Sequence, residues 1–428
     1  MNAIYYPKLD ETVYRETLEN GLQVAVVPRK GFTKSLAYFV TDYGAIHKDY
    51  GFCGEICHAP AGVAHYLEHK LFDMPGERDV SAEFAAMGAM TNAFTSYDMT
   101  AYYFSTTEHF SECLKLLLEF VSTPYFTDES VEKERGIIDQ EIDMNLDAPD
   151  SVIFENLVTS LYEAHPIRVP ILGSHQSIRE ITPEVLYSCH RAFYTPGNML
   201  LCVVGDVDAE EVKAIALEVL GTEKREVGQK MPISEEALTT PRKDIRCKME
   251  VAMPMFNLAF KCPAVGKGEQ AIRQEMIADL AAEALFGESS QLYLELYQEG
   301  IIDTSFGGGF ETIDGCAMLL CSGDSNYPEA VRERLIRQAE ALGRDGISEE
   351  DFQRMKRSAF GRRVRGLDSF DSTCFRICAY HFGGFDYFRF PEVYETIQKE
   401  EIQEFLKNYV NYENSSLSVI APVEQEAV

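Results

Sequence analysis

The two halves of this chain end in the same pattern, and that repetition constrains the fold more than any other sequence feature. In the first half, a helical stretch at 183–193 precedes a Thr-Pro-Gly-Asn turn and the apolar run 200–204. In the second half, a helical stretch at 402–409 precedes a polar turn and the apolar run 417–420. A repeat of about 200 residues is too long for a solenoid. We therefore expect two structurally similar α+β domains, each an antiparallel-rich sheet packed with helices.

The length agrees with that division. At about 150 residues per domain, 428 residues predict two to three domains. A polar stretch from Gly221 to Asp244 has few large apolar side chains, which is typical of a linker. We therefore place an N-terminal domain at 1–222, a linker at 223–243 and a C-terminal domain at 244–428.

The pattern of apolar residues predicts the main elements of each half. We expect strand 21–28 to have strand 35–41 as its neighbour, and Gly88 to end a short helix at 81–87. The other expected elements of the first half are helices at 61–72, 109–121 and 130–145, a hairpin at 91–96 and 100–105, and a strand at 199–205. The second half is expected to begin with strand 251–261 and helix 270–286.

The net charge of the chain limits the classes of molecule that it can bind. The chain has 39 Lys and Arg against 69 Asp and Glu, a formal net charge of −30. A field of that sign repels phosphate backbones, so we expect no nucleic-acid partner. It would instead attract basic partners such as cationic peptides. Hydrophobic residues make up 46% of the chain, which is ordinary for a globular protein.

Cysteine usage and the N-terminal sequence bear on location. The eleven cysteines show no disulfide-framework spacing, which favours a reducing compartment. We see no signal peptide and no apolar run near the roughly 18 residues of a spanning helix, so we expect a cytoplasmic protein without a membrane partner. Two pairs, Cys53/Cys57 followed by His58, and Cys374/Cys378, allow a zinc interpretation, but buried free thiols are favoured over it.

The motif that carries chemistry is His65-Tyr-Leu-Glu68-His69. On a helix, positions i and i+4 share a face, so both imidazoles can reach one metal ion. Zinc suits two neutral imidazoles and a carboxylate, with the fourth position left to water. The alternative is an amphipathic surface helix that carries two solvated histidines.

A third ligand must come from elsewhere in the chain. Glu134 and Glu141 are seven residues apart on an expected helix, so they project from one face. One of them could ligate the metal while the other supports the site. The alternative is that both belong to an acidic helix surface, which is common in so acidic a chain.

Together these motifs resemble the pitrilysin/insulinase metallopeptidases, the inverted zincins. The resemblance is greatest to the half-length members similar to mitochondrial processing peptidase subunits. It covers nearly the whole chain and is dense in residues 60–206. After the histidine motif it is carried by Gly88-Ala-Met-Thr-Asn92-Ala93-Phe-Thr95, Thr100-Ala-Tyr-Tyr103, Glu134-Arg135 with Glu141, His165-Pro166, Ile181-Thr182 and Phe193-Tyr194-Thr-Pro196-Gly-Asn198.

The resemblance implies a fold and a set of roles. The fold is a half-shell of two α+β domains, the second without a metal site, and the cofactor is one Zn²⁺ per chain. His65, His69 and Glu141 match the zinc ligands, and Glu68 matches the general base. Glu134 matches an auxiliary acidic residue of the catalytic site. Asn92 and Ala93 match the edge strand on which these enzymes bind a peptide substrate as an added β-strand.

The second half departs from the family pattern. Members that work unaided carry an Arg and a Tyr seven residues apart, but Tyr297 stands where Arg is expected and Asp303 stands near the expected Tyr. The resemblance therefore implies a zinc metalloendopeptidase that forms one half of a two-chain clamshell. Its partner would be a related chain that supplies the Arg and Tyr, or a second copy of itself. The alternative is a non-catalytic structural or assembly subunit of the same fold.

Overall fold

The computed structural model describes residues 1–76 and 78–423, which form two compact units. Unit 1 consists of Met1–Ile142, Val169–Pro232 and Val364–Arg389, and unit 2 of Asp143–Arg168, Ile233–Arg363 and Phe390–Val428. Each contains one large sheet with helices packed on it, so the expected two-domain α+β fold is confirmed. Among the described residues, no helix is long and apolar enough to cross a membrane.

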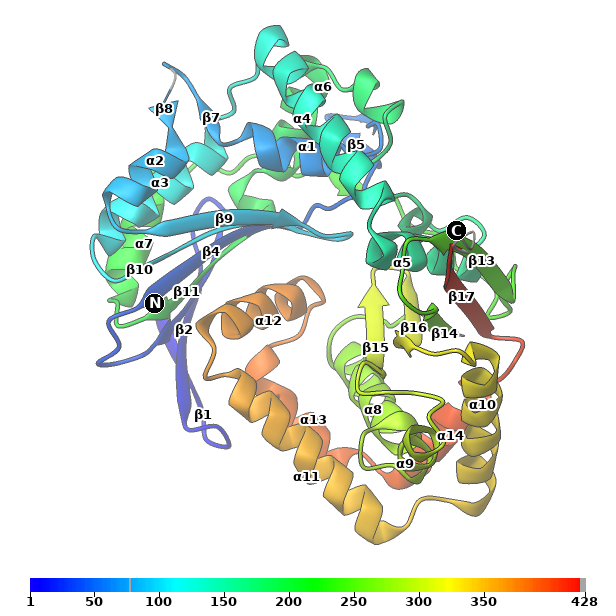
Figure 1. Cartoon of the computed structure of the whole chain (residues 1–428). Helices are drawn as coiled ribbons and strands as arrows, with labels where there is room; N and C mark the ends of the chain where they lie inside the picture. Colours follow the sequence, from blue (N-terminus) through cyan, green and yellow to red (C-terminus); the bar gives the residue numbers. More distant parts are fainter. Residues whose placement is uncertain (77, 424–428) are drawn as a thin grey trace. The chain divides into compact units, whose positions relative to one another are not determined.

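The sheet of unit 1 has seven strands in the order β1-β2-β3-β11-β4-β10-β9 (Figure 1). Their bounds are β1 (Asn2–Tyr6), β2 (Glu11–Thr17), β3 (Gln23–Pro28), β11 (Met199–Gly205), β4 (Ser35–Thr41), β10 (Thr100–Thr106) and β9 (Met90–Thr95). The expectation that β3 and β4 are neighbours is wrong. Strand β11 lies between them, parallel to β3 and antiparallel to β4, because its seven buried residues require a central position.

Helices pack on both faces of this sheet. On one face lie α1 (Val63–Lys70), α2 (Val80–Ala86), α3 (Phe110–Ser122) and α7 (Ala209–Leu220), which bury Phe84, Tyr102, Phe104 and Phe120. Helix α6 (Pro183–Phe193) packs beside α1, and α4 (Asp128–Leu146) joins it through Tyr66, whose hydroxyl donates to the Val131 carbonyl. Helix α12 (Phe370–Phe382) packs on β4 and β11, and Phe375 contacts the ring of Phe94 on the face that Phe94 shares with Tyr38 and Tyr103.

Unit 2 has a five-stranded sheet in the order β13-β17-β14-β16-β15. Its strands are β13 (Asp244–Met249), β17 (Ser415–Pro422), β14 (Met255–Cys262), β16 (Cys316–Asp324) and β15 (Gly307–Ile313). Helix α5 (Pro149–Leu161) packs on β13, β14 and β17, while α8 (Glu269–Phe286) packs on β15. The remaining helices of this half are α9 (Gln291–Gln298), α10 (Pro328–Asp345), α11 (Glu349–Gly366), α13 (Phe390–Thr396) and α14 (Lys399–Tyr409).

The two sheets repeat the same topology. In unit 1 the order β3-β11-β4-β10-β9 has one parallel pair, β3 with β11, followed by antiparallel pairs. In unit 2 the order β13-β17-β14-β16-β15 has the same parallel pair, β13 with β17, followed by antiparallel pairs. The duplication inferred from the two chain endings is therefore present in the strand order.

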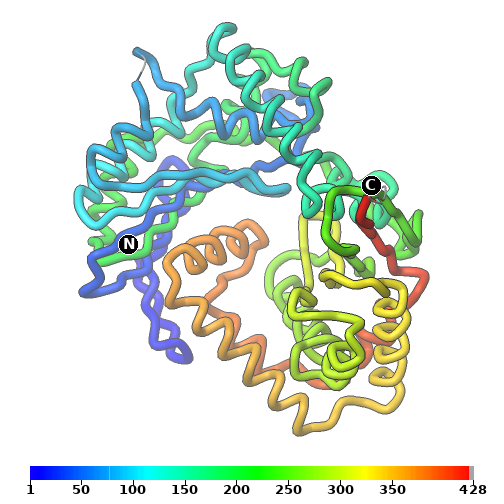
Figure 2. Tube along the Cα trace, viewed as in Figure 1, coloured from blue at the N-terminus to red at the C-terminus, as the bar shows by residue number. Residues whose placement is uncertain are grey.

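The units differ from the predicted domains 1–222 and 244–428. Unit 1 includes residues 364–389, which carry α12, and unit 2 includes residues 143–168, which carry α5 (Figure 2). The reason is packing, since each of these helices buries its apolar face on the sheet formed by the other half of the sequence. The predicted linker, 223–243, contains the two-residue strand β12 (Gln229–Lys230), which pairs with β5 (Asp49–Phe52).

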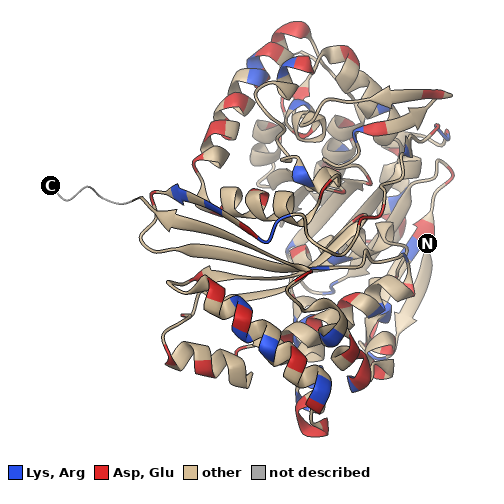
Figure 3. Cartoon of the chain, turned by 90° about the vertical axis from the view of Figure 1, so that its right-hand side faces the viewer, with Lys and Arg blue, Asp and Glu red and all other residues tan. Residues whose placement is uncertain are grey.

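The cysteines are all free, and the buried-thiol interpretation is correct for Cys374 and Cys378, which are fully buried. It is wrong for Cys53, which is exposed because it lies in the turn between β5 and β6 (Glu55–His58) with a φ of 52°. Within the described residues, neither pair belongs to a cluster that could hold a metal ion. Acidic side chains occur on many helices of the chain, interspersed with basic ones (Figure 3).

Candidate metal centre

The centre is built on α1 and α4, which lie side by side in unit 1 (Figure 1). Helix α1 begins after Gly62, whose φ is 91°, and a Cβ at that position would collide with the Leu172 carbonyl. Only glycine fits such a left-handed, closely packed position, so the start of the helix is fixed. One turn separates His65 from His69, and their ring centroids are 4.6 Å apart.

Glu141 on α4 faces both imidazoles. Its Oε2 lies 3.5 Å from His65 Nε2 and 3.6 Å from His69 Nε2, and within the described residues these three side chains form the one group that could hold a metal ion. Tetrahedral zinc with ligand bonds of about 2.0–2.1 Å would place ligand atoms about 3.4 Å apart. The two separations from the Glu141 oxygen are close to this value, and all three ligand atoms lie within 4.8 Å of one another.

Glu134 lies on the outer side of His69. Its Oε1 is 2.8 Å from His69 Nδ1, and only 14% of the Glu134 side chain is exposed. A carboxylate at this nitrogen keeps the proton on Nδ1 and leaves the Nε2 lone pair for a metal. Of the two carboxylates that the sequence offered, Glu141 faces both Nε2 atoms, and Glu134 faces the Nδ1 atom of His69.

His65 has no such support. Its Nδ1 is buried, and no hydrogen-bond partner for it is found among the described residues. The side chain is only 8% exposed. The site thus combines one histidine oriented by a carboxylate with one held by packing.

His69, Glu134 and Glu141 have pKa values that their neighbours in this group shift toward the charged forms. Burial opposes charge on His69, but the hydrogen bond that its Nδ1 donates to Glu134 and the nearby carboxylates outweigh burial and raise the pKa of the imidazole. Burial likewise opposes charge on Glu134, yet its pKa is lowered because His69 stabilises the carboxylate. The pKa of Glu141 is lowered mainly by its contact with His65. Both carboxylates are therefore anionic at neutral pH and available to a cation.

Glu68 precedes His69 on the same helix and is partly exposed. Its Oε2 accepts a hydrogen bond of 2.6 Å from the hydroxyl of Thr95. Thr95 was not identified as a site residue from the sequence. The signal was available in strand alternation, because residues 91, 93 and 95 of an edge strand share one face.

Asn92 and Ala93 lie on β9, which is an edge strand of the unit 1 sheet, as the substrate-binding prediction requires. The amide of Ala93 donates to the side-chain oxygen of Asn92 at 2.9 Å instead of joining the ladder with β10. That amide therefore faces the open edge of the sheet, where an added strand would meet it.

The two positions that depart from the family pattern lie in unit 2. Tyr297, on α9, is 49% exposed and its ring stacks on Tyr293 with centroids 6.2 Å apart. The Asp303 carboxylate accepts hydrogen bonds from the amide and hydroxyl of Ser305. Asp303 is thus engaged within its own turn, whereas Tyr297 presents its ring to solvent.

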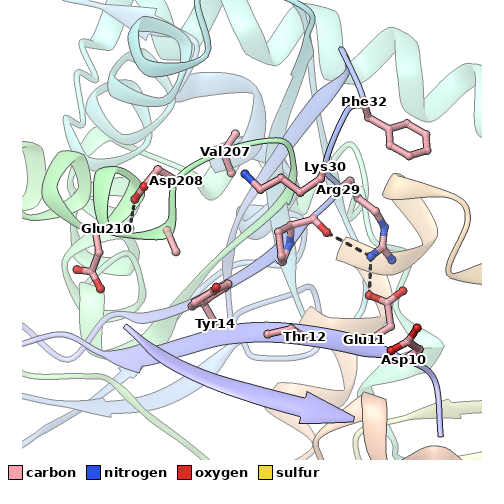
Figure 4. A pocket seen from close by; sticks show the side chains of 12 residues that line it. Asp10, Glu11, Thr12, Tyr14, Arg29, Lys30, Phe32, Val207, Asp208 and Glu210 are labelled. Atoms are coloured by element: carbon pink, nitrogen blue, oxygen red, sulfur yellow. Dashed lines mark hydrogen bonds and ion pairs between the residues drawn. The ribbon is translucent and has the colours of Figure 1, made fainter. Parts of the chain in front are cut away.

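A separate open pocket of about 660 Å³ lies in unit 1 between β2, β3 and the start of α7 (Figure 4). Its basic side chains are paired, Arg29 with Glu11 at 2.6 Å and Lys30 with Asp206 at 2.7 Å. The Asp208 carboxylate caps α7. None of the lining residues is a histidine or a cysteine, so this pocket lacks the donor set of the candidate metal centre.

Two sequence families match the chain in succession. Residues 57–175, which include the metal centre, match the family described as Insulinase (Peptidase family M16). Residues 180–359 match the family described as Peptidase M16 inactive domain. Both matches agree with a metal centre confined to the first half of the sequence.

Individual relatives extend the likeness over the whole chain. The chain is 35% identical over 99% of both sequences to a Bacillus subtilis protein named "Uncharacterized zinc protease YmfH". It is similar to a solved structure of a putative M16-like peptidase from Alicyclobacillus acidocaldarius, with a TM-score of 0.92, 32% identity and coverage of 96% and 99% of the two chains. A Helicobacter pylori protease shares the fold, with a TM-score of 0.82 at 19% identity over 96% and 99% of the chains. The chain belongs to the M16, or pitrilysin/insulinase, peptidase family and is a member of the half-length type.

Proposed function

We propose that this chain is a zinc-dependent metalloendopeptidase that hydrolyses peptides as one half of a two-chain assembly. The observation that supports it most is the convergence of His65 Nε2, His69 Nε2 and Glu141 Oε2, with separations of 3.5 and 3.6 Å to the carboxylate oxygen. Relatives named as zinc proteases support zinc as the metal. We propose one ion per chain, at this group of three side chains.

His65, His69 and Glu141 would hold the zinc ion, which when bound would lower the pKa of water toward about 7 and polarise a carbonyl group as a Lewis acid. Glu68 then acts as the general base, which accepts a proton from the attacking water and returns it to the leaving amine. Glu134 holds the His69 ring in a fixed orientation.

The substrate would bind as an extended peptide on β9. An added strand pairs through its backbone with the open edge of the sheet. Specificity for the peptide's sequence would therefore come from the protein side chains that surround the bound peptide. The Ala93 amide is one donor for this pairing, once the Asn92 side chain releases it. This mode accepts unfolded peptides, and a chamber closed by pairing of two chains would exclude folded proteins.

A partner chain is proposed because Tyr297 stands where the family pattern has Arg and Asp303 stands near the expected Tyr. If the Arg and Tyr of the family pattern hold substrate and stabilise the oxyanion, this chain needs them from a related chain in a heterodimer. Loss of one oxyanion donor costs about 10²–10³ in kcat. A homodimer is the other arrangement, and it should be slow because it lacks the Arg and Tyr. The alternative is that Tyr297 or another local side chain substitutes for the missing pair.

A non-catalytic assembly subunit is the second candidate, because Tyr297 replaces the expected Arg. The intact set His65, Glu68, His69 and Glu141 favours the enzyme, since a subunit that only assembles has no need of a base beside the ligands. For location we propose the cytoplasm, which agrees with the eleven free cysteines.

The experiment compares wild type and Glu68→Gln on a mixed peptide library, each alone and with a candidate partner chain. Wild type should hydrolyse peptides, faster with the partner, and the variant should lose at least about 10²-fold in rate while its zinc content stays the same. Residual activity within tenfold of wild type would show that Glu68 is not the base. Zinc binding without hydrolysis under any pairing would support the assembly subunit.

A further inference from the structure

The edge strand that would hold the substrate is bonded directly to the proposed general base. Thr95 is the last residue of β9, and its Oγ1 donates to Glu68 Oε2 at 2.6 Å. Helix α1 and β9 are in contact, so the bond joins two packed elements of unit 1. A hydroxyl that donates to one carboxylate oxygen restricts the rotation of the whole group.

The direction of this bond determines what it can do. Thr95 Oγ1 is the donor and Glu68 Oε2 is the acceptor, so the bond engages one oxygen of the carboxylate. The second oxygen of Glu68 is left to accept a proton from water. Because a general base must lie within hydrogen-bond distance of the proton it takes, a carboxylate free to rotate would spend less time in the productive position.

The strand also supplies a matched hydroxyl that does not reach the base. Thr91 lies on the same face of β9, four residues earlier, and its Oγ1 donates to the Tyr103 carbonyl on β10 at 3.0 Å. Both threonines are β-branched and partly buried in the same strand. The two hydroxyls differ in their hydrogen-bond partners. That of Thr95 contacts a carboxylate of the site, whereas that of Thr91 contacts a backbone carbonyl.

We propose that Thr95 is a positioning residue for the reaction, which fixes the Glu68 carboxylate and links it mechanically to the substrate-binding strand. The inference rests on the proposed function. Pairing of a peptide with β9 would immobilise the end of the strand that carries Thr95. The Glu68 carboxylate would then be held in position when the scissile bond lies in the site. The hydroxyl acts through Glu68 and does not itself touch the reacting atoms.

The test uses Thr95→Val, which keeps the shape and removes the donor, and Thr95→Ser, which keeps the donor. Thr95→Val should lower kcat about 10- to 100-fold, with KM within about threefold of wild type and zinc content unchanged. Thr95→Ser should restore kcat to within about threefold. Thr91→Val measures the cost of a lost hydroxyl elsewhere in β9, and its kcat should fall far less. If Thr95→Val does not fold, Thr95→Ala should show the same loss.

A second measurement needs no activity. Crystal structures of the metal-free proteins should show the Glu68 carboxylate bonded to residue 95 in wild type and Thr95→Ser, and turned away from it in Thr95→Val. Equal kcat in wild type and Thr95→Val, or a Glu68 carboxylate in the same place without the hydroxyl, would overturn the proposal. Absence of hydrolysis by the wild type would instead refute the proposed function, and the crystal structures would still decide whether Thr95 fixes Glu68.

Discussion

The Nδ1 atom of His69 and the Oε1 atom of Glu134 are 2.8 Å apart, so one carboxylate of α4 orients a ring of α1 while a second, Glu141, faces its other nitrogen. Two turns of α4 separate the carboxylates, and each has a different task. The geometry therefore predicts that substitutions at the two positions should affect zinc binding to different degrees.

Replacing Glu134 with Gln should weaken zinc binding about 10- to 100-fold, since a neutral amide orients the imidazole and supports its basicity less well. Titration of the metal-free protein with a competing chelator measures this. Glu129→Gln, at an exposed position of the same helix, is the control and should bind zinc as wild type does. Unchanged affinity in Glu134→Gln would show that His69 is oriented by packing alone.

Replacing Glu141 with Gln should weaken zinc binding more than Glu134→Gln does, because it changes the carboxylate that lies near both Nε2 atoms. The same chelator titration compares the two variants. If zinc occupancy of Glu141→Gln survives at low free metal, the third ligand lies elsewhere, with Glu134 the first to examine.

The predicted linker contains a structural anchor that can be tested through stability. Glu236 accepts the backbone amides of Glu163, Ala164 and His165 at 2.7–2.9 Å and pairs with Lys261, which is only 3% exposed. Burial alone would raise the pKa of Glu236, but these bonds lower it from 4.5 to about 2. The carboxylate therefore stabilises the fold in its ionised form.

Glu236→Gln should lower the free energy of unfolding at pH 7 by about 2 kcal/mol, because charged hydrogen bonds are lost. Since folding lowers this pKa, the stabilisation is present above about pH 4.5 and is lost as the pH falls toward about 2. Urea unfolding at several pH values measures the difference between the two proteins. Glu235→Gln, at an exposed neighbour, should show no such difference, and a pH-independent gap would contradict the assignment.

Substrate charge should matter if part of the −30 net charge faces the bound peptide. Lys-rich peptides should then have a higher kcat/KM than matched Glu-rich peptides, and the advantage should shrink as salt screens the field. Comparing both peptides at low and high ionic strength tests this. Equal values without a salt response would mean that the acidic excess serves only the outer surface.

Local sequence signals led to residues that lie together in the structure, but they did not show which segments belong to which unit. The i, i+4 spacing of His65 and His69 and the seven-residue spacing of Glu134 and Glu141 follow from helix geometry, and the helices formed where expected. Assigning Glu141 rather than Glu134 as the ligand needed either the family resemblance or the packing of α1 on α4. Strand alternation places Thr95 on the same face as residues 91 and 93, but nothing in the sequence shows that Glu68 is its partner.

The rest of the fold depends on contacts between distant residues. The insertion of β11 between β3 and β4 joins strands more than 150 residues apart, and no local pattern distinguishes it from a simple hairpin neighbour. The exchange of α5 and α12 between the two halves has the same origin, because either helix could have covered its own sheet. The role of Glu236 could not be predicted for the same reason, because the sequence of a polar stretch does not show which backbone amides donate to its carboxylate.

The most direct test of the account is the zinc content of the purified chain by elemental analysis, after loading with zinc and removal of unbound metal. The account predicts one zinc ion per wild-type chain and none in the double variant His65→Ala/His69→Ala. The Cys53→Ser/Cys57→Ser variant should retain its zinc. A wild-type chain that binds no zinc, or a double variant that keeps it, would contradict the assignment of His65, His69 and Glu141 as the metal centre.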